Sequence, residues 1–236
     1  MGAFLAMIGY PFRPHMAVIF CGLSMALFAC GNTDARPLDQ AVGALVSLVK
    51  SEPPADVNAV RSGLTPEMVA ALQEAYTLFG LPKLNAGATM TVFSATGNRV
   101  DWRGDDGVSI VMLNDIVIAT RGLGADLFLA DAGGVRAAVA DKSGNVTRSH
   151  SWLDGENREV TVGYDCVISV AGFETVDLIS RNVEAERISE TCYVRGTDIV
   201  AFANDYWIAV SDGQLWQSNQ WISDNIGYLF VQHLRR

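Results

Sequence analysis

The chain has 236 residues, 50% of them hydrophobic, and a formal net charge of −9 at pH 7. An acidic chain without a cluster of Lys and Arg is a poor candidate for binding nucleic acid, and it does not adhere to anionic lipid by charge alone. Behind a leader segment, about 200 residues remain, which is enough for one domain with a sizeable core. We therefore expect one domain and no nucleic-acid partner.

The leader contains an uncharged apolar run at residues 17–28, AVIFCGLSMALF. A run of about twelve residues is too short to span a bilayer as a helix, which needs about twenty. It fits the apolar region of a secretory signal, and Arg13 lies just before it, where the positive region belongs. We predict a signal peptide over residues 1–29.

The run ends in Leu27-Phe28-Ala29-Cys30, which resembles the lipobox of bacterial lipoproteins. The resemblance implies cleavage before Cys30, a diacylglycerol on its sulfur and an acyl chain on its amine, with no other cofactor. Several acyl chains anchor a protein durably. Gly31 is not the aspartate that often retains lipoproteins in the inner membrane, which favours the outer membrane. The alternatives are a plain secretory signal with a chance cysteine and an uncleaved anchor.

The two remaining cysteines of the exported part, Cys166 and Cys192, are expected to pair in an oxidising compartment. The chain-entropy model gives such a bond roughly 3–4 kcal/mol. The alternative is two reduced, buried cysteines. A redox enzyme and a zinc site are not expected, because the sequence has no CxxC motif and no Cys/His cluster.

The exported part begins with a short polar tether at residues 30–37, followed by a single β-rich domain at residues 38–236. A first helix is predicted over 38–50, before Pro53 and Pro54. A second begins at Thr65-Pro66-Glu67, an N-cap followed by proline and an acid. Apolar residues at helical spacing extend it to Phe79, where Gly80 and Pro82 end it.

From about residue 88, short runs rich in Val, Ile, Thr and aromatic residues alternate with turn residues, as expected for strands. Tight turns are predicted at Gly97-Asn98, Asn114-Asp115 and Asp212-Gly213. The expected strands are 89–96, 99–102, 108–113, 116–120, 135–141, 148–154, 159–170, 175–180, 185–195, 199–204, 206–210, 214–221 and 228–234. The fold class is therefore mainly β: an antiparallel meander forming a curved or barrel-like sheet, with one or two N-terminal helices.

Chemical motifs are sparse in this chain. His150 and His233 have no sequence neighbour of catalytic type, and no pair of carboxylates stands out for glycosidase chemistry. The segment 121–124, RGLG, is neither a P-loop nor a dinucleotide fingerprint. Arg121 and Asp126 either form an ion pair or contact an anionic ligand, and we favour the structural role. No catalytic residue and no metal site is predicted, so we do not expect an enzyme.

The tryptophans fall in or beside expected strands, where they either fill a β core or stack on sugar rings. They are Trp102, Trp152, Trp207, Trp216 and Trp221. In the strand 214–221, Trp216 faces one way and Trp221 the other, because side chains alternate. Either one tryptophan lies in the core and the other is exposed to a ligand, or the strand is covered by other parts of the protein on both faces.

Two segments resemble the YjbF/GfcB-type lipoproteins. One reads NDYWIAVSDGQLWQSNQW at 204–221, similar to an N-x-Y-W-V-D…G-x-I-x-x-S-x-Q pattern, and the other reads TRGLGADL at 120–127. Val210 departs from an aspartate familiar in part of the family, with Asp212 nearby. The resemblance implies a curved all-β domain on an outer-membrane lipoprotein facing the periplasm, encoded with export machinery for exopolysaccharide or group 4 capsule. It supplies no catalytic residues.

We therefore expect a non-enzymatic lipoprotein that binds polysaccharide or a polysaccharide export protein. Its candidate ligand or partner surface comprises Arg121, Asp126, Tyr206, Trp207, Trp216 and Trp221. The alternative is a lipid or lipoprotein carrier with an apolar cavity in a half-open barrel, and a polysaccharide-cleaving enzyme is a third reading. A wide aliphatic cavity favours the carrier, an open aromatic groove with polar groups favours glycan, and two facing carboxylates favour the enzyme.

Overall fold

The computed structural model describes residues 56–236. The predicted signal peptide, the lipidation site at Cys30, the tether 30–37 and the helix 38–50 lie outside the described residues. Within those that are described, no helix is long and apolar enough to cross a membrane.

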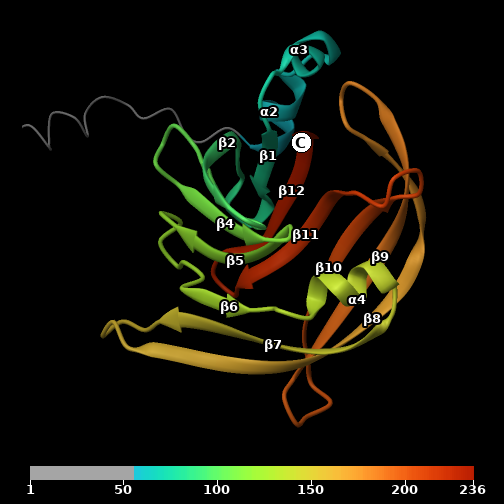
Figure 1. Cartoon of the computed structure of the whole chain (residues 1–236). Helices are drawn as coiled ribbons and strands as arrows, with labels where there is room; N and C mark the ends of the chain where they lie inside the picture. Colours follow the sequence, from blue (N-terminus) through green and yellow to red (C-terminus); the bar gives the residue numbers. More distant parts are fainter. Residues whose placement is uncertain (1–55) are drawn as a thin grey trace, which may run out of the picture. The chain divides into compact units, whose positions relative to one another are not determined.

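Twelve strands and a few short helices make up this part of the chain (Figure 1). The helices are α2 (Val57–Ser62), α3 (Pro66–Ala71), the 3-10 helix η1 (Pro82–Leu84) and α4 (Val135–Asp141). The strands are β1 (Tyr76–Leu81), β2 (Ala86–Thr96), β3 (Arg99–Arg103), β4 (Ser109–Leu113), β5 (Ile116–Arg121), β6 (Leu129–Asp131), β7 (Gly144–Leu153), β8 (Glu159–Asp177), β9 (Asn182–Val194), β10 (Val200–Ala209), β11 (Leu215–Ser223) and β12 (Gly227–Arg235).

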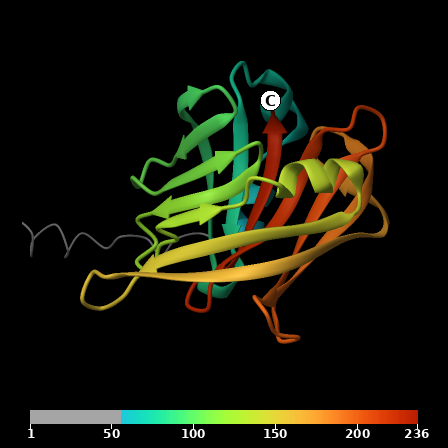
Figure 2. The ribbon, with the colours of Figure 1, turned by 60° about the horizontal axis from the view of Figure 1, so that its bottom comes forward.

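All twelve strands form one antiparallel sheet in the order β5-β4-β3-β2-β1-β12-β11-β10-β9-β8-β7-β6. Strands that are adjacent in the sheet are therefore consecutive in the chain, with one exception: the last strand, β12, pairs with the first, β1. The sheet curls into a nearly closed barrel whose two edges, β5 and β6, come together (Figures 1 and 2). The predicted antiparallel meander in a barrel-like sheet is confirmed.

Side chains and one helix fill the barrel. Leu127, Ile222 and Leu229 belong to one buried cluster, and Ile188 and Tyr206 belong to a second that includes α4. Helix α4 lies within the curve of the sheet and contributes Val135, Ala138 and Val139 to that second cluster (Figure 2). We call the end of the barrel that α4 covers the closed end. We call the opposite end, which carries the β5–β6, β7–β8 and β11–β12 connections, the mouth.

Helix α2 packs on the outside of β1 and β2. Asp56 caps it by accepting bonds from the backbone N–H groups of Asn58 and Ala59. Gly80 and Gly87 face each other on β1 and β2, and a Cβ on either would come within 2.7 Å of an atom of Val57. The two glycines thus create the flat patch on which the start of α2 rests.

The predicted second helix is only partly correct. Thr65 caps α3 and Pro66 opens it as expected, but the helix ends at Ala71, and residues from Tyr76 onward form β1. Leu78 is completely buried between two partner strands. The apolar residues extending to Phe79 fit both a helix and a strand buried on both faces, and pairing with β12 and β2 decides for the strand.

Residues 135–141 form helix α4, so the strand predicted there is wrong. The run VRAAVAD is too short for periodicity to separate the two states, and its alanines favour a helix. Strand β6 was missed because it has only three residues. The strands predicted at 159–170 and 175–180 are one strand, β8, with a bulge near Gly172. Those predicted at 199–204 and 206–210 are likewise one strand, β10.

Candidate functional site

The loop between β5 and β6 joins the two edges of the sheet. The Thr120 N–H donates to Leu127 O at 2.9 Å. The Arg121 guanidinium donates to three backbone carbonyls across the junction, those of Thr120, Leu127 and Phe128. Arg121 therefore bonds to the backbone of the barrel junction, and within the described residues it forms no ion pair with Asp126, which was the structural role expected from the sequence.

Asp126 holds the same loop from inside. Its carboxylate accepts bonds from the Thr120 hydroxyl at 2.8 Å, the Gly122 N–H at 3.0 Å and the Leu123 N–H at 3.1 Å. Gly122 and Gly124 have φ of +92° and +89°, a region that glycine adopts at little cost. In this loop Asp126 thus bonds to hydroxyl and backbone donors, while Arg121 bonds to carbonyls. We call the segment 120–128 the latch.

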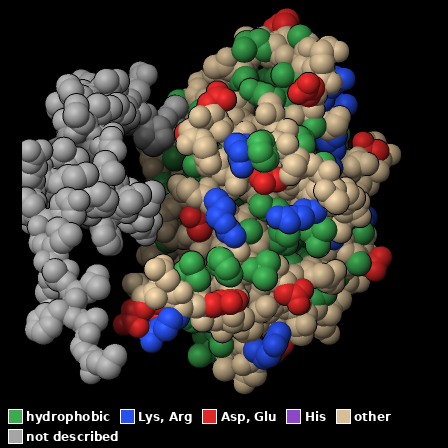
Figure 3. All heavy atoms as spheres, turned by 60° about the vertical axis from the view of Figure 1, so that its left-hand side comes forward, with side chains coloured by type: hydrophobic (Ala, Val, Ile, Leu, Met, Phe, Trp, Pro, Cys, Tyr) green, Lys and Arg blue, Asp and Glu red, His purple; other side chains and the backbone are tan. Residues whose placement is uncertain are grey.

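A groove with a cavity volume of about 560 Å³ opens beside the latch at the mouth. We call it the mouth groove. Its walls come from the latch, the β7–β8 turn and the β11–β12 turn. Its lining includes Arg121, Asp126, Phe128, Trp152, Asp154, Asn157, Trp221, Ser223, Asp224 and Asn225. On the latch side of the molecule, acidic and basic side chains are interspersed with hydrophobic ones (Figure 3).

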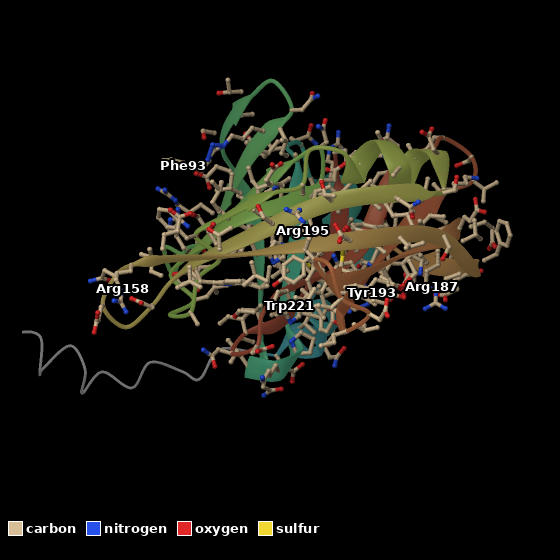
Figure 4. All side chains as sticks on the ribbon, turned by 90° about the horizontal axis from the view of Figure 1, so that it is seen from below. Phe93, Arg158, Arg187, Tyr193, Arg195 and Trp221 are labelled. Carbon is tan, nitrogen blue, oxygen red and sulfur yellow. A yellow bond between two sulfur atoms is a disulfide. The ribbon has the colours of Figure 1, made fainter. Side chains whose placement is uncertain are left out.

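The mouth groove combines aromatic rings with hydrogen-bonding groups. Trp152 and Trp221 stand edge to face with centroids 5.6 Å apart, and Trp152 is fixed by a 3.1 Å bond from its Nε1 to Ile222 O. In the view from below, Trp221 lies near the middle of the molecule, and Arg158 marks the tip of the β7–β8 hairpin (Figure 4). Such a set of rings and polar groups suits a ligand with apolar faces and hydroxyls.

Two of the carboxylates in the mouth groove are occupied by their own loops. Asp154 accepts bonds from the backbone N–H groups of Glu156 and Arg158 and from Arg158 Nε. The two backbone bonds lower the pKa of Asp154, which opposes a role as general acid. Asp126 is bound within the latch. Asp224 and the amides of Asn157 and Asn225 remain as groups that can face a ligand.

Trp221 sits where β10 and β11 separate. The ladder between these strands ends at Asp205 opposite Asn219. Beyond it, the Trp221 N–H donates to Asn204 Oδ1 at 2.7 Å, and the Ala203 N–H donates to the Tyr228 hydroxyl. Side chains thus replace the missing ladder bonds. The Trp221 ring stacks on Phe202 with centroids 4.6 Å apart.

Behind Trp221 lies a completely buried histidine. His150 stacks on both Trp221 and Phe202, with interplanar angles of 13° and 12°, and meets Trp152 edge to face. Burial, together with the charge of Arg148, lowers the pKa of His150 to about 2. It is therefore a neutral aromatic support for the mouth groove.

A buried ion pair lies deeper in the barrel. Glu190 Oε2 accepts bonds from Arg148 Nη1 at 2.8 Å, Asn204 Nδ2 at 2.7 Å and the Tyr206 hydroxyl at 2.8 Å. Burial and then Glu190 raise the pKa of Tyr206 well above its usual value. Asn204 connects this network to Trp221. The sequence placed Tyr206 on a ligand or partner surface. In the structure Tyr206 is completely buried, and its hydroxyl bonds inside the barrel instead.

Gln220 of β11 bonds across the barrel interior to β5 and the β4–β5 turn. Its amide accepts from the Val117 N–H and donates to Asp115 O and to the Ser218 hydroxyl. The pattern that suggested the family, Asn204, Tyr206, Ser218 and Gln220, is therefore largely a set of interior hydrogen bonds. None of these four side chains is exposed by more than 2%.

The remaining candidate residues lie apart from the mouth groove. Trp216 is buried near the closed end and is contacted by the guanidinium groups of Arg181 and Arg236. Trp207 is half-buried on the outer face of β10, where its Nε1 donates to Glu174 at 2.9 Å. Among the candidate residues, the structure brings Arg121, Asp126 and Trp221 together. Trp152 also lines this groove, although it was not among the candidate residues. Its position at the mouth depends on the sheet topology.

The predicted disulfide joins Cys166 of β8 to Cys192 of β9, which face each other in the ladder. The Glu190 carboxylate lies within 4.8 Å of both sulfurs. Because the sulfurs are bonded to each other, this trio does not offer the thiolates that a metal ion would need. The bond therefore ties together the two long strands that frame the buried ion pair.

Comparison with known proteins places this geometry in a family. A family model described as group 4 capsule polysaccharide lipoprotein gfcB, YjbF, matches residues 43–234. The crystal structure of the hypothetical lipoprotein YmcC from Escherichia coli (K12) has a TM-score of 0.64 at 17% identity, and the match covers 87% of this chain and 98% of that chain. At this identity the likeness shows a shared fold. No curated protein matches the chain.

Proposed function

Because the chain belongs to the YjbF family of group 4 capsule polysaccharide lipoproteins, we propose that it assists the production or export of a surface polysaccharide by binding glycan in the mouth groove. The supporting observation is the composition of that groove. Trp152 and Trp221 line it together with the polar groups of Asn157, Asp224 and Asn225. Aromatic side chains suit the apolar side of a sugar ring, and amide and carboxylate groups suit its hydroxyls.

In this proposal the protein is not an enzyme, and it binds its ligand while anchored to a membrane. Lipid on Cys30 would anchor it to the outer membrane, facing the periplasm, where exported polysaccharide passes. Asp126 and Asp154 are bound within their own loops, so we assign neither to bond cleavage. The role is then to hold or guide a polymer rather than to cut it.

A lipid carrier is less well supported. The apolar pocket lined by Phe79, Leu81, Met90, Ile110 and Leu229 has a volume of about 250 Å³. Pockets that bury a small-molecule ligand usually measure about 300–1,000 Å³. Elsewhere in the described barrel, the interior is filled by core side chains and α4. An acyl chain would have to displace this core.

The test is calorimetric titration of the full-length protein, purified from membranes in detergent, with the surface polysaccharide of the cells that encode it. Trp221→Ala and Asp224→Ala should each weaken binding about tenfold, the loss typical of a central contact. Trp221→Phe keeps a ring and should retain most of the affinity. Tyr193→Ala, a half-buried aromatic of β9, is the matched control.

Absence of saturable binding by the wild-type protein would exclude glycan binding. Photo-crosslinking from position 157 in intact cells distinguishes the ligand from an export protein, since a protein adduct alone would assign the mouth groove to that partner. Deletion of the chain should lower surface polysaccharide, and an unchanged amount would contradict the proposed pathway.

A further inference from the structure

A second groove lies on the outside of the barrel. Its floor is the outer face of β10, β11 and β12, and its walls are α2 and the end of β8. It has a volume of about 560 Å³ and shares no lining residue with the mouth groove. We call it the α2 groove. Its lining includes Asn58, Arg61, Trp207, Gln217, Asn219 and Phe230.

The floor of the α2 groove carries side chains that strand alternation directs outward. In β11 the buried Ser218 lies between Gln217 and Asn219, which therefore face out of the barrel. The ladders set Trp207 beside Gln217 and Phe230 beside Asn219. The floor thus combines two aromatic residues with two amides.

The β8–β9 hairpin bends toward α2 and forms one wall of the groove (Figure 1). Arg61 of α2 binds Asp177 at the end of β8 at 2.9 Å. Arg61 also donates to the side chain of Gln232, whose amide donates to Asp177 O at 3.1 Å. Beyond this contact, Ile179 of the hairpin turn packs in the same apolar cluster as Val60 of α2. The two walls are therefore held together by contacts within the protein.

The turn of this hairpin is held in a strained conformation. Ile179 has φ of +69°, a region that β-branched residues rarely adopt. Its N–H donates to Asp177 Oδ1 at 2.7 Å, so the turn and the contact of Asp177 with Arg61 depend on the same residue. Strained residues persist where the surroundings fix them, and they gather at binding sites. The strain agrees with a wall that is formed before a ligand arrives.

The charged groups of the α2 groove are paired with groups of opposite sign. Arg61 binds Asp177, and Glu174 binds Arg187 at 2.9 Å. Glu174 also accepts a bond from Trp207 Nε1 at 2.9 Å. An anionic ligand would have to compete with a carboxylate for each guanidinium, and a cationic ligand with a guanidinium for each carboxylate. The groove therefore suits an uncharged ligand.

Amide groups of the groove are left to bind such a ligand. Within residues 56–236, the side chains of Asn58 and Asn219 take part in no hydrogen bond, although both line the groove. In the same part of the chain Gln217 uses only its oxygen, which accepts a bond from Gln232 at 2.8 Å. An amide offers both donors and an acceptor, so it can bond to a hydroxyl in either direction.

We propose that the α2 groove is a second glycan site, which binds an uncharged sugar residue independently of the mouth groove. This inference rests on the proposed function and adds a site to it. Trp207 and Phe230 contact the apolar side of the sugar ring, and the amides of Asn58, Gln217 and Asn219 bond to its hydroxyls. One protein then holds polysaccharide at two separate points, which strengthens its hold on a long polymer without strengthening either contact.

The test is calorimetric titration of the full-length protein in detergent with short fragments of the surface polysaccharide. The fragments are released by mild acid and separated into uncharged and acidic fractions. The uncharged fraction should fill a site that Asn58→Ala and Asn219→Ala each weaken about tenfold and that Trp221→Ala leaves unchanged. Affinity at this site should not depend on salt, because the ligand carries no charge.

The variants are chosen to keep the fold intact. Neither amide bonds to another group within the described residues, so both variants should unfold at the wild-type urea concentration. Asn145→Ala removes an exposed amide of β7 outside both grooves and is the matched control, which should change no site. Photo-crosslinking from position 175, on the β8 wall, should yield a saccharide adduct in intact cells. A protein adduct alone would assign the groove to a protein partner and refute the proposal.

The outcomes separate this site from the proposed function. If Trp221→Ala weakens binding while Asn58→Ala and Asn219→Ala change nothing, the second site is refuted and the mouth groove stands. If only acidic fragments fill the α2 groove, its uncharged ligand is refuted. If Asn219→Ala weakens binding and Trp221→Ala does not, the α2 groove stands and the mouth groove fails. If no fragment binds, both proposals fail.

Discussion

The β1–β12 pair and the β5–β6 junction close the same sheet by different means. β1 and β12 form a ladder that runs from Tyr76 opposite Arg235 to Gly80 opposite Phe230. At the β5–β6 junction, side chains of Arg121 and Asp126 do most of the bonding. A ladder built from backbone groups tolerates most side chains, whereas the latch depends on a few specific ones. The two closures should therefore respond differently to substitution.

The largest effect is expected from breaking the ladder. Val231→Pro removes a backbone N–H from the middle of β12, which has a partner strand on each side. The cost should exceed about 3 kcal/mol and abolish folding, since proline is excluded from central strands. Val231→Ala removes side-chain volume but keeps the N–H. Urea unfolding of both variants is the measurement, and equal midpoints would contradict closure by the ladder.

A smaller and more local effect is expected at the latch. Asp126→Ala removes the acceptor of three hydrogen bonds and should lower the free energy of unfolding by roughly 2–3 kcal/mol. Amide hydrogen exchange should accelerate across residues 120–128 while the β1–β12 amides stay protected. Asp105→Ala, at an exposed loop position, is the control. Uniform acceleration over the whole sheet would show that the latch is not a separate unit.

Asp115 links the two sides of the barrel at the closed end. Burial would raise its pKa, but His233 and Arg236 of the β12 end lower it to about 2 from 3.8. Because the folded protein binds this proton less tightly than the unfolded chain, the stabilisation is present above pH 3.8 and disappears as the pH falls through about 2.

Asp115→Asn should therefore destabilise the protein by about 2 kcal/mol at neutral pH, following roughly 1.4 kcal/mol per unit of pKa. The difference between wild type and variant should vanish near pH 2. Urea titrations over this pH range measure it. A difference that does not depend on pH would mean that the carboxylate charge is not what joins the two sides.

The smallest effect is expected at Gly124. Its φ is +89° and an added Cβ would meet nothing within 4 Å, so Gly124→Ala should cost only the backbone strain, about 1 kcal/mol. Gly155→Ala, also in open space but without a positive φ, should be nearly neutral. Thermal unfolding of the two variants compares them, and equal stabilities would mean that the latch does not require its glycine conformation.

The sequence predicted the hairpins better than it predicted the ends of the sheet. Asn114 and Asp115 both have positive φ, as a tight turn between β4 and β5 requires, and Gly213 does so between β10 and β11. Such turns are local, so sequence reveals them. β1 was assigned to a helix because its strand character depends on a partner at the far end of the chain.

The candidate site was only partly visible for the same reason. Arg121, Asp126 and Trp221 stood out by motif and residue type, yet what each contacts depends on the closure of the barrel. The alternation Arg148–His150–Trp152 in β7 was a signal that those side chains share one face. Nothing local indicates that Arg148 is buried against Glu190, because a buried charge is recognisable only with its partner.

The pairing of β1 with β12 also has a consequence for how the protein is made. An exported chain that crosses the membrane N-terminus first carries an unpaired β1 edge until β12 has followed. Contacts between distant segments form slowly, so this edge stays open to chaperones, proteases and other chains in the meantime. The sheet is thus completed only when β12 pairs with β1, and a chain truncated before β12 would retain an open edge that proteases can recognise.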